Sequence, residues 1–432
     1  MKIGILGGGI AGLSLAYFLK EKSVIFEREK NIGGLGRSFG LNGIHYDIGP
    51  HIIFSKNKEI VNLHASLTET NEIRRSNKIF HKGRLVKYPF ENDLAALEKN
   101  DMEYCLKEFL NNPYENYEAK NMLQFFLKTF GEGITRLYLQ PYNEKIWKLD
   151  PAFMDVQMVE RIPKPPKEDV IKSAEGISTE GYQHQLYFRY PKKGGFQSLV
   201  NAYAGLIREK SEIIYPVKIT EISKNNGKWS LKTDKGDFEF STLVNCMPLH
   251  ELFRYVEAPK IVLEALNGLK YNSIYIVVLQ AKKDNIGENF SLNFADKDII
   301  FHRISKLNFL GEEYCLSGNS PTFLAEVTYR PGSYLAGLGQ EEVKRRVVSD
   351  LDRLNLVAKG DITDIEARSF EYAYPIYDLN HRKNTDVVLD YLKGLGIHCC
   401  GRFAEFEYIN SDKVVENAQN LAKKLNSSTN AQ

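Results

Sequence analysis

Three observations predict a mixed α/β fold with more than one domain. The chain has 432 residues, and at about 150 residues per domain this length favours two to three folded units. Hydrophobic residues make up 43% and charged residues 26%, which is typical of a globular protein and not of a disordered or collagen-like chain. A glycine-rich strand, turn and helix pattern opens the sequence, and β-type runs at 273–279 and 323–329 follow a long helical stretch.

The first segment is predicted to form a strand, a tight turn and a helix. Residues 2–6 are a β-type run, and residues 13–20 carry apolar side chains at helical spacing. The turn between them has the Gly-x-Gly-x-x-Gly pattern of a Rossmann-like fold. There Gly7 permits the turn, Gly9 lets a pyrophosphate approach the backbone, and Gly12 lets helix and strand pack closely. The amino end of the helix then faces the bound anion.

A second strand ends in an acidic residue that suits a ribose. Residues 23–26 are β-type and Glu27 follows them directly, where a carboxylate can accept a hydrogen bond from a ribose hydroxyl. The strand context and this acid together favour an adenine dinucleotide over a chance glycine loop. FAD and NAD both remain open at this point.

A second glycine-rich turn follows at residues 32–38. A plain nicotinamide-binding domain has no need of it, although taken alone the stretch would equally suit a surface loop. This turn and the next run, residues 46–54, resemble the FAD-binding superfamily that includes amine oxidases, protoporphyrinogen oxidase and UDP-galactopyranose mutase. The resemblance implies that Arg37 reaches the flavin pyrophosphate and that His51 lies beside the isoalloxazine ring.

Further segments extend the likeness to UDP-galactopyranose mutases of the eukaryotic type over nearly the whole chain. In order, they are residues 87–92, 140–147, 160–161, 188–195, 374–375 and 401–408. The resemblance implies a nucleotide-sugar substrate bound by Tyr88, Asn143, Trp147, Arg161, Tyr271, Tyr374 and Tyr408. It implies FAD bound by Gly7, Gly9, Gly12, Glu27, Gly34, Leu35, Arg37, His51, Val217, Arg402 and Asp412, with no metal.

The chemistry of these residues suits substrate binding, but each of them also has a purely structural interpretation. Asn143 and Trp147 lie at i and i+4, so a helix would place them on one face, with the indole offered to a base or simply buried in the core. Arg161 has a planar fork that suits phosphate oxygens, but an ion pair with a glutamate such as Glu160 is the competing interpretation.

The segment near Ser411 and Asp412 also has two interpretations, a flavin contact or a helix cap. A helix beginning near Ser411 and Asp412 could point its amino end at the flavin and stabilise negative charge on the reduced ring. Asp412 equally suits a simple helix N-cap. Val217 begins the β segment that returns to the nucleotide-binding fold, and its backbone is expected to pair with adenine.

The sequence departs from the mutases at one point that concerns the diphosphate. In the mutases, the strand that begins at the position of Tyr271 ends in a second arginine, which residues 271–283 lack. Lys282 could supply a point charge but not a fork, and Arg303 is the other candidate. The catalytic residues we predict are His51, Arg161 and Arg303.

Three functions stay open, and the first is preferred. A mutase would interconvert pyranose and furanose forms of a nucleotide-sugar through attack by N5 of reduced FAD, with NAD(P)H as a candidate reductant. An FAD-dependent oxidase or dehydrogenase of the protoporphyrinogen oxidase or amine oxidase type is the alternative. A flavin-bound sensor or scaffold without turnover is the third hypothesis.

Charge and composition exclude other partners. Lys and Arg number 57 against 55 Asp and Glu, so no overall field attracts nucleic acid. Five cysteines without metal-site spacing argue against a disulfide framework or zinc. No stretch reaches the roughly 18 apolar residues of a transmembrane helix, and we expect a cytoplasmic protein.

The domains are expected to be interleaved along the chain. The FAD-binding domain would comprise residues 1–70, 195–260 and 390–426, the helical substrate domain residues 92–172, and the sheet substrate domain residues 71–91, 173–194 and 265–385, before a polar tail at 427–432.

Overall fold

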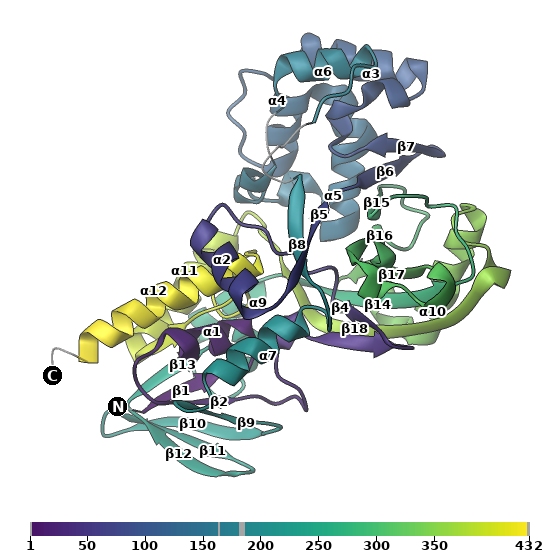
Figure 1. Cartoon of the computed structure of the whole chain (residues 1–432). Coiled ribbons are helices and arrows are strands. Elements are labelled where there is room, and N and C mark those ends of the chain that lie inside the picture. Colours follow the sequence, from purple (N-terminus) through teal and green to yellow (C-terminus); the bar gives the residue numbers. More distant parts are fainter. Residues whose placement is uncertain (1, 163–164, 181–185, 430–432) are drawn as a thin grey trace.

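The computed structural model describes residues 2–162, 165–180 and 186–429. Figure 1 shows three lobes: a helical one at the top, a sheet-based one at the right and an α/β one at the lower left, which holds both termini. The predicted mixed α/β class, with a Rossmann-like domain, helices and antiparallel sheets, is confirmed.

A five-stranded parallel sheet forms the centre of the α/β lobe. Its strands, in spatial order, are β19 (Ile397–Cys399), β13 (Thr242–Asn245), β1 (Ile3–Leu6), β2 (Ser23–Phe26) and β9 (Ser211–Ile214). Successive side chains point to opposite faces: Ile25 of β2 packs into one core, and Val24 and Phe26 pack into the other. A parallel sheet covered on both faces needs such continuous apolar strands.

Helices cover one face of this sheet, and helices together with a small sheet cover the other. The first face carries α1 (Ile10–Phe18), α2 (Lys58–Leu67), α7 (Gln197–Leu206) and α12 (Ser411–Thr429). The second carries the antiparallel strands β10 (Ile219–Asn225), β11 (Lys228–Thr233) and β12 (Gly236–Phe240), with α8 (Leu249–Leu252), α9 (Lys260–Gly268) and α11 (His381–Leu395).

A seven-stranded sheet forms the second lobe, and one of its faces packs against α10 (Gly339–Arg353). Its order is β18 (Ile362–Pro375), β14 (Tyr271–Ala281), β17 (Thr322–Tyr329), β16 (Arg303–Lys306), β15 (Ser291–Phe294), β6 (Asn77–His81) and β7 (Arg84–Lys87). The strands pair antiparallel except for β15 with β6.

The helical lobe contains α3 (Lys99–Leu110), α4 (Met122–Ile134), a π-helical turn η4 (Thr135–Leu139), α5 (Gln140–Trp147) and α6 (Lys167–Ala174). Glycines let α3 and α4 approach closely: a Cβ on Gly133 would lie 2.6 Å from the Cα of Cys105. Two short antiparallel ribbons run between the lobes (Figure 1), β3 (Ser38–Leu41) with β4 (Ile44–Asp47) and β5 (Thr70–Arg74) with β8 (Tyr187–Pro191).

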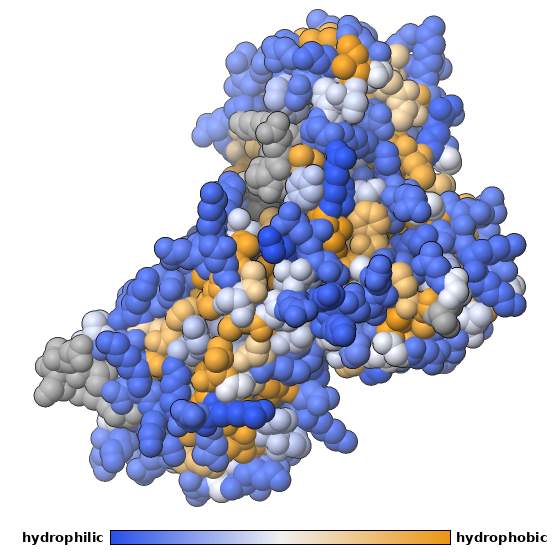
Figure 2. Space-filling model, viewed as in Figure 1, coloured by the Kyte–Doolittle hydropathy of each residue, from blue (hydrophilic) through white to orange (hydrophobic). Residues whose placement is uncertain are grey.

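Hydrophilic residues cover most of the face shown in Figure 2, and hydrophobic ones gather over the lower lobe and where the lobes meet. Among the described helices, none combines the length and the apolar character that crossing a membrane requires.

Candidate functional site

Two glycine turns meet above the carboxyl ends of β1 and β2. Gly7 has a φ of +111°, and a Cβ on Gly12 would lie 2.2 Å from the Gly7 carbonyl oxygen. Gly9 bridges to Gly33 of the second turn, and a Cβ on Gly34 would lie 3.2 Å from the Gly9 Cα. Side chains at Gly7, Gly12 and Gly34 would press against neighbouring backbone, so glycine keeps both turns close to the amino end of α1, where backbone N–H groups can hold a phosphate.

A cavity of about 1110 Å³ extends from these turns; we call it the cofactor cavity. Among its lining residues are Gly7, Gly9, Glu27, Gly34, Leu35, Arg37, His51, Val217 and Arg402. Gly12 lies beneath the turn. Ser411 and Val414 of α12 line the cavity, whereas Asp412, between them in sequence, is not among the lining residues. The volume exceeds that of most small-ligand pockets, and the cavity is bordered by both glycine turns, so it has room for a dinucleotide.

Glu27 is held at the end of β2 by backbone groups. Its two carboxylate oxygens accept hydrogen bonds from the N–H of Gly8 and of Glu29, each at 2.9 Å. Burial raises the pKa of Glu27, and these hydrogen bonds oppose that effect. The N–H of Val217 donates to the Glu27 carbonyl at 2.9 Å, so the group that Val217 can offer to adenine is its carbonyl.

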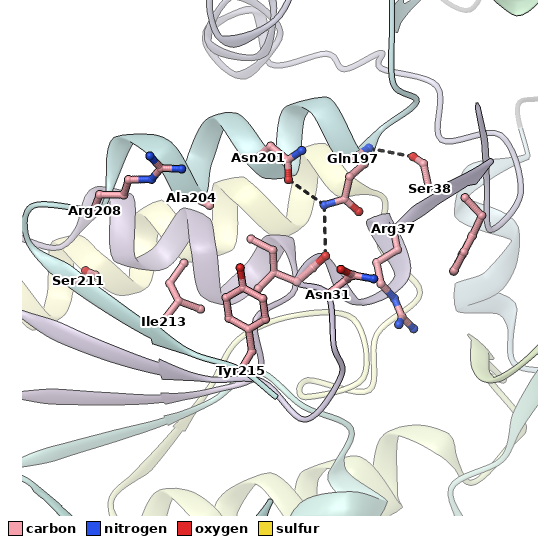
Figure 3. Close-up of a pocket in the computed structure, with 12 residues that line it drawn as sticks. Asn31, Arg37, Ser38, Gln197, Asn201, Ala204, Arg208, Ser211, Ile213 and Tyr215 are labelled. Atoms are coloured by element: carbon pink, nitrogen blue, oxygen red, sulfur yellow. Dashed lines mark hydrogen bonds between the residues drawn. The ribbon is translucent and has the colours of Figure 1, made fainter. Parts of the chain in front are cut away.

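Arg37 stabilises the second turn. Its Nε donates to the Gly34 carbonyl at 2.9 Å, and Nη1 lies 3.3 Å from a Glu29 carboxylate oxygen. Behind this turn lies a second cavity of about 680 Å³, which shares Arg37 with the first (Figure 3). Gln197 spans it, donating to the Ile32 carbonyl at 3.2 Å and to Asn201 at 3.0 Å. These bonds tie the turn to α7.

His51 follows β4 and is positioned by a buried aspartate. Its N–H lies 3.4 Å, and its Nδ1 3.9 Å, from Oδ2 of Asp47. Asp47 also accepts hydrogen bonds from Ser38, Tyr190 and the N–H of Phe196. Burial lowers the pKa of His51, with Asp47 opposing it, so the ring is neutral at pH 7 and can present a nitrogen to the cavity.

Arg303 lies next to the His51 loop and pairs with Glu326. In the sheet, β16 and β17 place the two residues directly opposite each other. The guanidinium Nε and Nη2 contact the two carboxylate oxygens at 2.5 and 2.8 Å. A Cβ on Gly49 would lie 3.1 Å from Glu326 Oε2 and 3.9 Å from Arg303 Nη2. The Glu326 side chain is 0% exposed and that of Arg303 is 33% exposed, so the arginine faces open space with Nη1 outside the ion pair.

Tyrosines from four other segments surround this pair. We call the group the arginine–tyrosine cluster: Tyr88, Tyr142, Arg303, Glu326, Tyr374 and Tyr408. Burial raises the pKa of Tyr374, and Glu326 adds to this while Arg303 opposes it. Burial likewise raises the pKa of Tyr88 and of Tyr142. These three phenols therefore stay protonated and can donate hydrogen bonds.

Asn143 and Trp147 face each other on α5, as their spacing predicts. Asn143 Oδ1 accepts from the indole N–H at 2.8 Å, and its Nδ2 donates to the Leu139 carbonyl at 2.7 Å. Both residues are 7% exposed. The indole ring lies edge-on to the rings of Tyr374 and Tyr408, at centroid distances of 5.7 and 5.3 Å. The pair thus supports the cluster from behind and is not an open stacking surface.

Arg402 contacts both the cofactor cavity and the arginine–tyrosine cluster. It lines the cofactor cavity and donates to the carbonyls of Ile409 and Ala373 at 2.8 and 3.2 Å. Its guanidinium lies 5.2 Å from the ring centroid of Tyr408, a distance typical of a cation–π contact. Arg402 thereby ties the cofactor cavity to the arginine–tyrosine cluster.

Two predicted residues, Tyr271 and Arg161, and the candidate Lys282 lie elsewhere or outside the described residues. Tyr271 donates to Glu371 at 3.0 Å and packs on Tyr372 at 4.8 Å, so it is not part of the arginine–tyrosine cluster. Lys282 is exposed just beyond the end of β14; of the two candidates for the missing arginine, Arg303 is the one beside His51. The backbone of Arg161 ends the short helix η6 (Val156–Arg161), and its side chain lies outside the described residues.

Sequence reasoning missed Glu326 and Tyr142 as members of the site. Glu326 is an acid within an otherwise apolar strand, and buried acids are almost always paired, so its need for a cation could have been inferred. Tyr142 directly precedes Asn143 in the segment singled out above and contacts Asn293 at 3.3 Å.

Two solved structures with a similar fold share low sequence identity with this chain. A reduced UDP-galactopyranose mutase has a TM-score of 0.88 at 22% identity, over 98% of this chain and 93% of that one. A putative protoporphyrinogen oxidase from Exiguobacterium sp. 255-15 has a TM-score of 0.77 at 16% identity, over 99% of both chains. The chain has the fold of flavoprotein mutases and oxidases.

Sequence comparisons agree with this flavoprotein fold. The family described as NAD(P)-binding Rossmann-like domain matches residues 5–67. Protoporphyrinogen oxidase 2, chloroplastic/mitochondrial, of Arabidopsis thaliana is 22% identical over 88% of this chain and 85% of that protein. Protoporphyrinogen oxidase, mitochondrial, of Nicotiana tabacum is 23% identical over 90% of this chain and 87% of that protein.

Proposed function

We propose that this chain is an FAD-dependent nucleotide-sugar mutase that interconverts the pyranose and furanose forms of a sugar. The observation that carries the proposal is the Arg303–Glu326 pair, which lies against the loop of Gly49 and His51. His51 of that loop lines the cofactor cavity. A guanidinium with one free edge at this place can bind the phosphate of a departing nucleoside diphosphate.

The chain's own residues supply the binding of the coenzyme. The amino end of α1 and the two glycine turns would hold the pyrophosphate, Glu27 a ribose hydroxyl, and the Val217 carbonyl the adenine. Arg37 fixes the second turn. When bound in its reduced form, FAD would supply the nucleophile for the anomeric carbon of the sugar.

The arginine–tyrosine cluster would position the substrate beside the ring. Glu326 occupies two nitrogens of Arg303 and so fixes the direction in which Nη1 points. Protonated Tyr88, Tyr142 and Tyr374 can donate to phosphate or sugar oxygens. Fixed donors of this kind stabilise the charge that develops on the diphosphate as its bond to the sugar breaks.

An anaerobic assay tests the proposal. Holoprotein reduced with dithionite would be incubated with UDP-galactofuranose or UDP-galactopyranose, and the nucleotides separated by chromatography. We expect interconversion by the reduced protein and none by the oxidised control. No interconversion of any UDP-, GDP- or dTDP-hexose would eliminate the mutase. Bleaching of the oxidised flavin by NADPH or NADH would identify the reductant.

A second candidate is an FAD-dependent oxidase or dehydrogenase. The observation in its favour is that two relatives found by sequence, each matching over most of this chain, are named protoporphyrinogen oxidases. This function predicts that protoporphyrinogen or an amine bleaches the oxidised flavin without air, and that oxygen restores the colour with production of hydrogen peroxide. A mutase would leave the oxidised flavin unbleached by its sugar-nucleotide.

A further inference from the structure

Arg75 is a cation at the arginine–tyrosine cluster that the resemblance does not single out. It follows β5, where its backbone N–H donates to the Leu186 carbonyl at 2.7 Å. The next carbonyl, that of Ser76, accepts from the N–H of Phe290 at 2.7 Å. The backbone is therefore fixed on both sides, between the β5–β8 ribbon and the seven-stranded sheet.

The guanidinium of Arg75 lies against Phe54 and interacts electrostatically with Tyr88 and Arg303 of the cluster. It sits 5.6 Å from the ring centroid of Phe54, three residues beyond His51. Burial lowers the pKa of Arg75, Tyr88 opposes this, and the positive charge of Arg303 lowers it further. The two guanidinium groups are thus close enough to repel each other.

Arg75 lacks the partners that a buried guanidinium needs. Its Nε and Nη2 are buried without a hydrogen-bond partner, and among the described side chains no carboxylate forms an ion pair with it. Residues 181–185 lie outside the description, but their sequence Gly-Tyr-Gln-His-Gln contains no acid. Arg303, by contrast, has Glu326. Leaving charged donors unpaired is costly, so such a group in a binding site indicates that an anionic ligand completes it.

We propose that Arg75 and Arg303 together bind the diphosphate of the nucleotide-sugar, with Arg303 in place of the arginine missing from the end of β14 and Arg75 as an additional guanidinium. This rests on the proposed function, and it names the residue that recognises the leaving group. A diphosphate carries a charge on each phosphate, so each guanidinium can take one. The repulsion between the two arginines is then replaced by attraction to the ligand between them.

Titration calorimetry of the FAD-loaded protein tests the inference with UDP, uridine and inorganic pyrophosphate as ligands. Arg75→Met should weaken UDP binding roughly tenfold to hundredfold, the range expected for a lost hydrogen bond to a charged group. Pyrophosphate binding should weaken similarly and uridine binding should stay unchanged. Arg75→Lys should restore part of the affinity because it returns the charge without the fork.

The neighbouring Arg74 provides a matched control. It is also an arginine, but its side chain is 63% exposed and pairs with Glu180 at 3.1 Å, so Arg74→Met should change UDP affinity by less than about twofold. Arg75→Met should also leave the ligand-free melting temperature unchanged or higher, because an unpaired charge is removed. A purely structural arginine would show the reverse.

The outcomes separate the two claims. UDP affinity that is unchanged in Arg75→Met, or uridine affinity that falls equally, overturns the role of Arg75 and leaves the mutase proposal standing. Wild-type protein that binds pyrophosphate through Arg75 but no nucleoside diphosphate retains the arginine pair and removes the nucleotide-sugar function. Protein that binds neither overturns both.

Discussion

The cofactor cavity and the arginine–tyrosine cluster adjoin at His51 but are built in different ways. The cofactor cavity is built around backbone groups, namely the glycine turns and the amino end of a helix. The Glu27 side chain beside them is itself held by two backbone N–H groups. Side chains from separate strands and helices make the second, around one buried ion pair. The cavity should therefore be sensitive to added atoms and the cluster to removed charges.

Adding one methyl group beneath the cavity should have the largest effect. In Gly12→Ala the Cβ would lie 2.2 Å from the Gly7 carbonyl oxygen, so strand and helix must separate. We expect a loss of more than about 4 kcal/mol in unfolding free energy together with loss of bound flavin, measured by urea denaturation and absorbance.

Gly205 of α7 is the control, because a Cβ there meets nothing within 4 Å. Gly205→Ala should stabilise the protein by about 0.5–1 kcal/mol. Full flavin content in Gly12→Ala would contradict a cavity made by close backbone approach.

Removing one charge from the arginine–tyrosine cluster should lower the unfolding free energy by somewhat less. Glu326→Gln leaves Arg303 without its carboxylate, and breaking a buried pair costs about 3–5 kcal/mol. The lower end is expected because the Arg303 side chain is 33% exposed. Urea denaturation would measure the change.

The double variant Arg303→Met with Glu326→Met should regain most of that stability while losing UDP binding. Glu221→Gln, in an exposed pair with Lys232, should leave stability unchanged. A double variant no more stable than Glu326→Gln would show that packing, and not an unpaired charge, explains the loss.

How far each region could be predicted follows from the same contrast. The glycine turns and Glu27 are local patterns, so consecutive residues predict their arrangement. The Arg303–Glu326 contact depends on the register of β16 and β17, which no local pattern encodes. Likewise Tyr271 matches a motif, but its contacts are with Glu371 and Tyr372 of β18, a long-range pairing that no local pattern encodes.

Acid should lower the stability of the folded protein through His64 of α2, which lies in the α/β lobe. Burial lowers its pKa to about 4 from 6.5, so the unfolded state binds a proton that the folded state resists. Stability is then complete above pH 6.5 and falls as the pH drops toward 4, by roughly 3 kcal/mol at most.

Urea denaturation at a series of pH values would measure how steeply the unfolding free energy falls with pH. His64→Leu should flatten this slope, whereas replacing the exposed His45 of β4 in the same way should leave it unaltered. An identical slope in His64→Leu would assign the acid sensitivity to other groups.

The smallest effect is expected at Lys282, the other candidate for the missing arginine. Its side chain is exposed and lies outside the cluster, so Lys282→Met should change UDP affinity by less than about twofold, whereas Arg303→Met should weaken it at least about tenfold. Calorimetry would compare them, and the reverse order would move the diphosphate site to the end of β14.

A crystal structure of the reduced holoprotein with UDP tests most directly whether the cofactor cavity and the arginine–tyrosine cluster form one site that meets at His51. We predict FAD in the cofactor cavity with its ring beside His51, and a diphosphate in contact with Nη1 of Arg303. A flavin bound elsewhere, or phosphates that avoid Arg303 altogether, would contradict it.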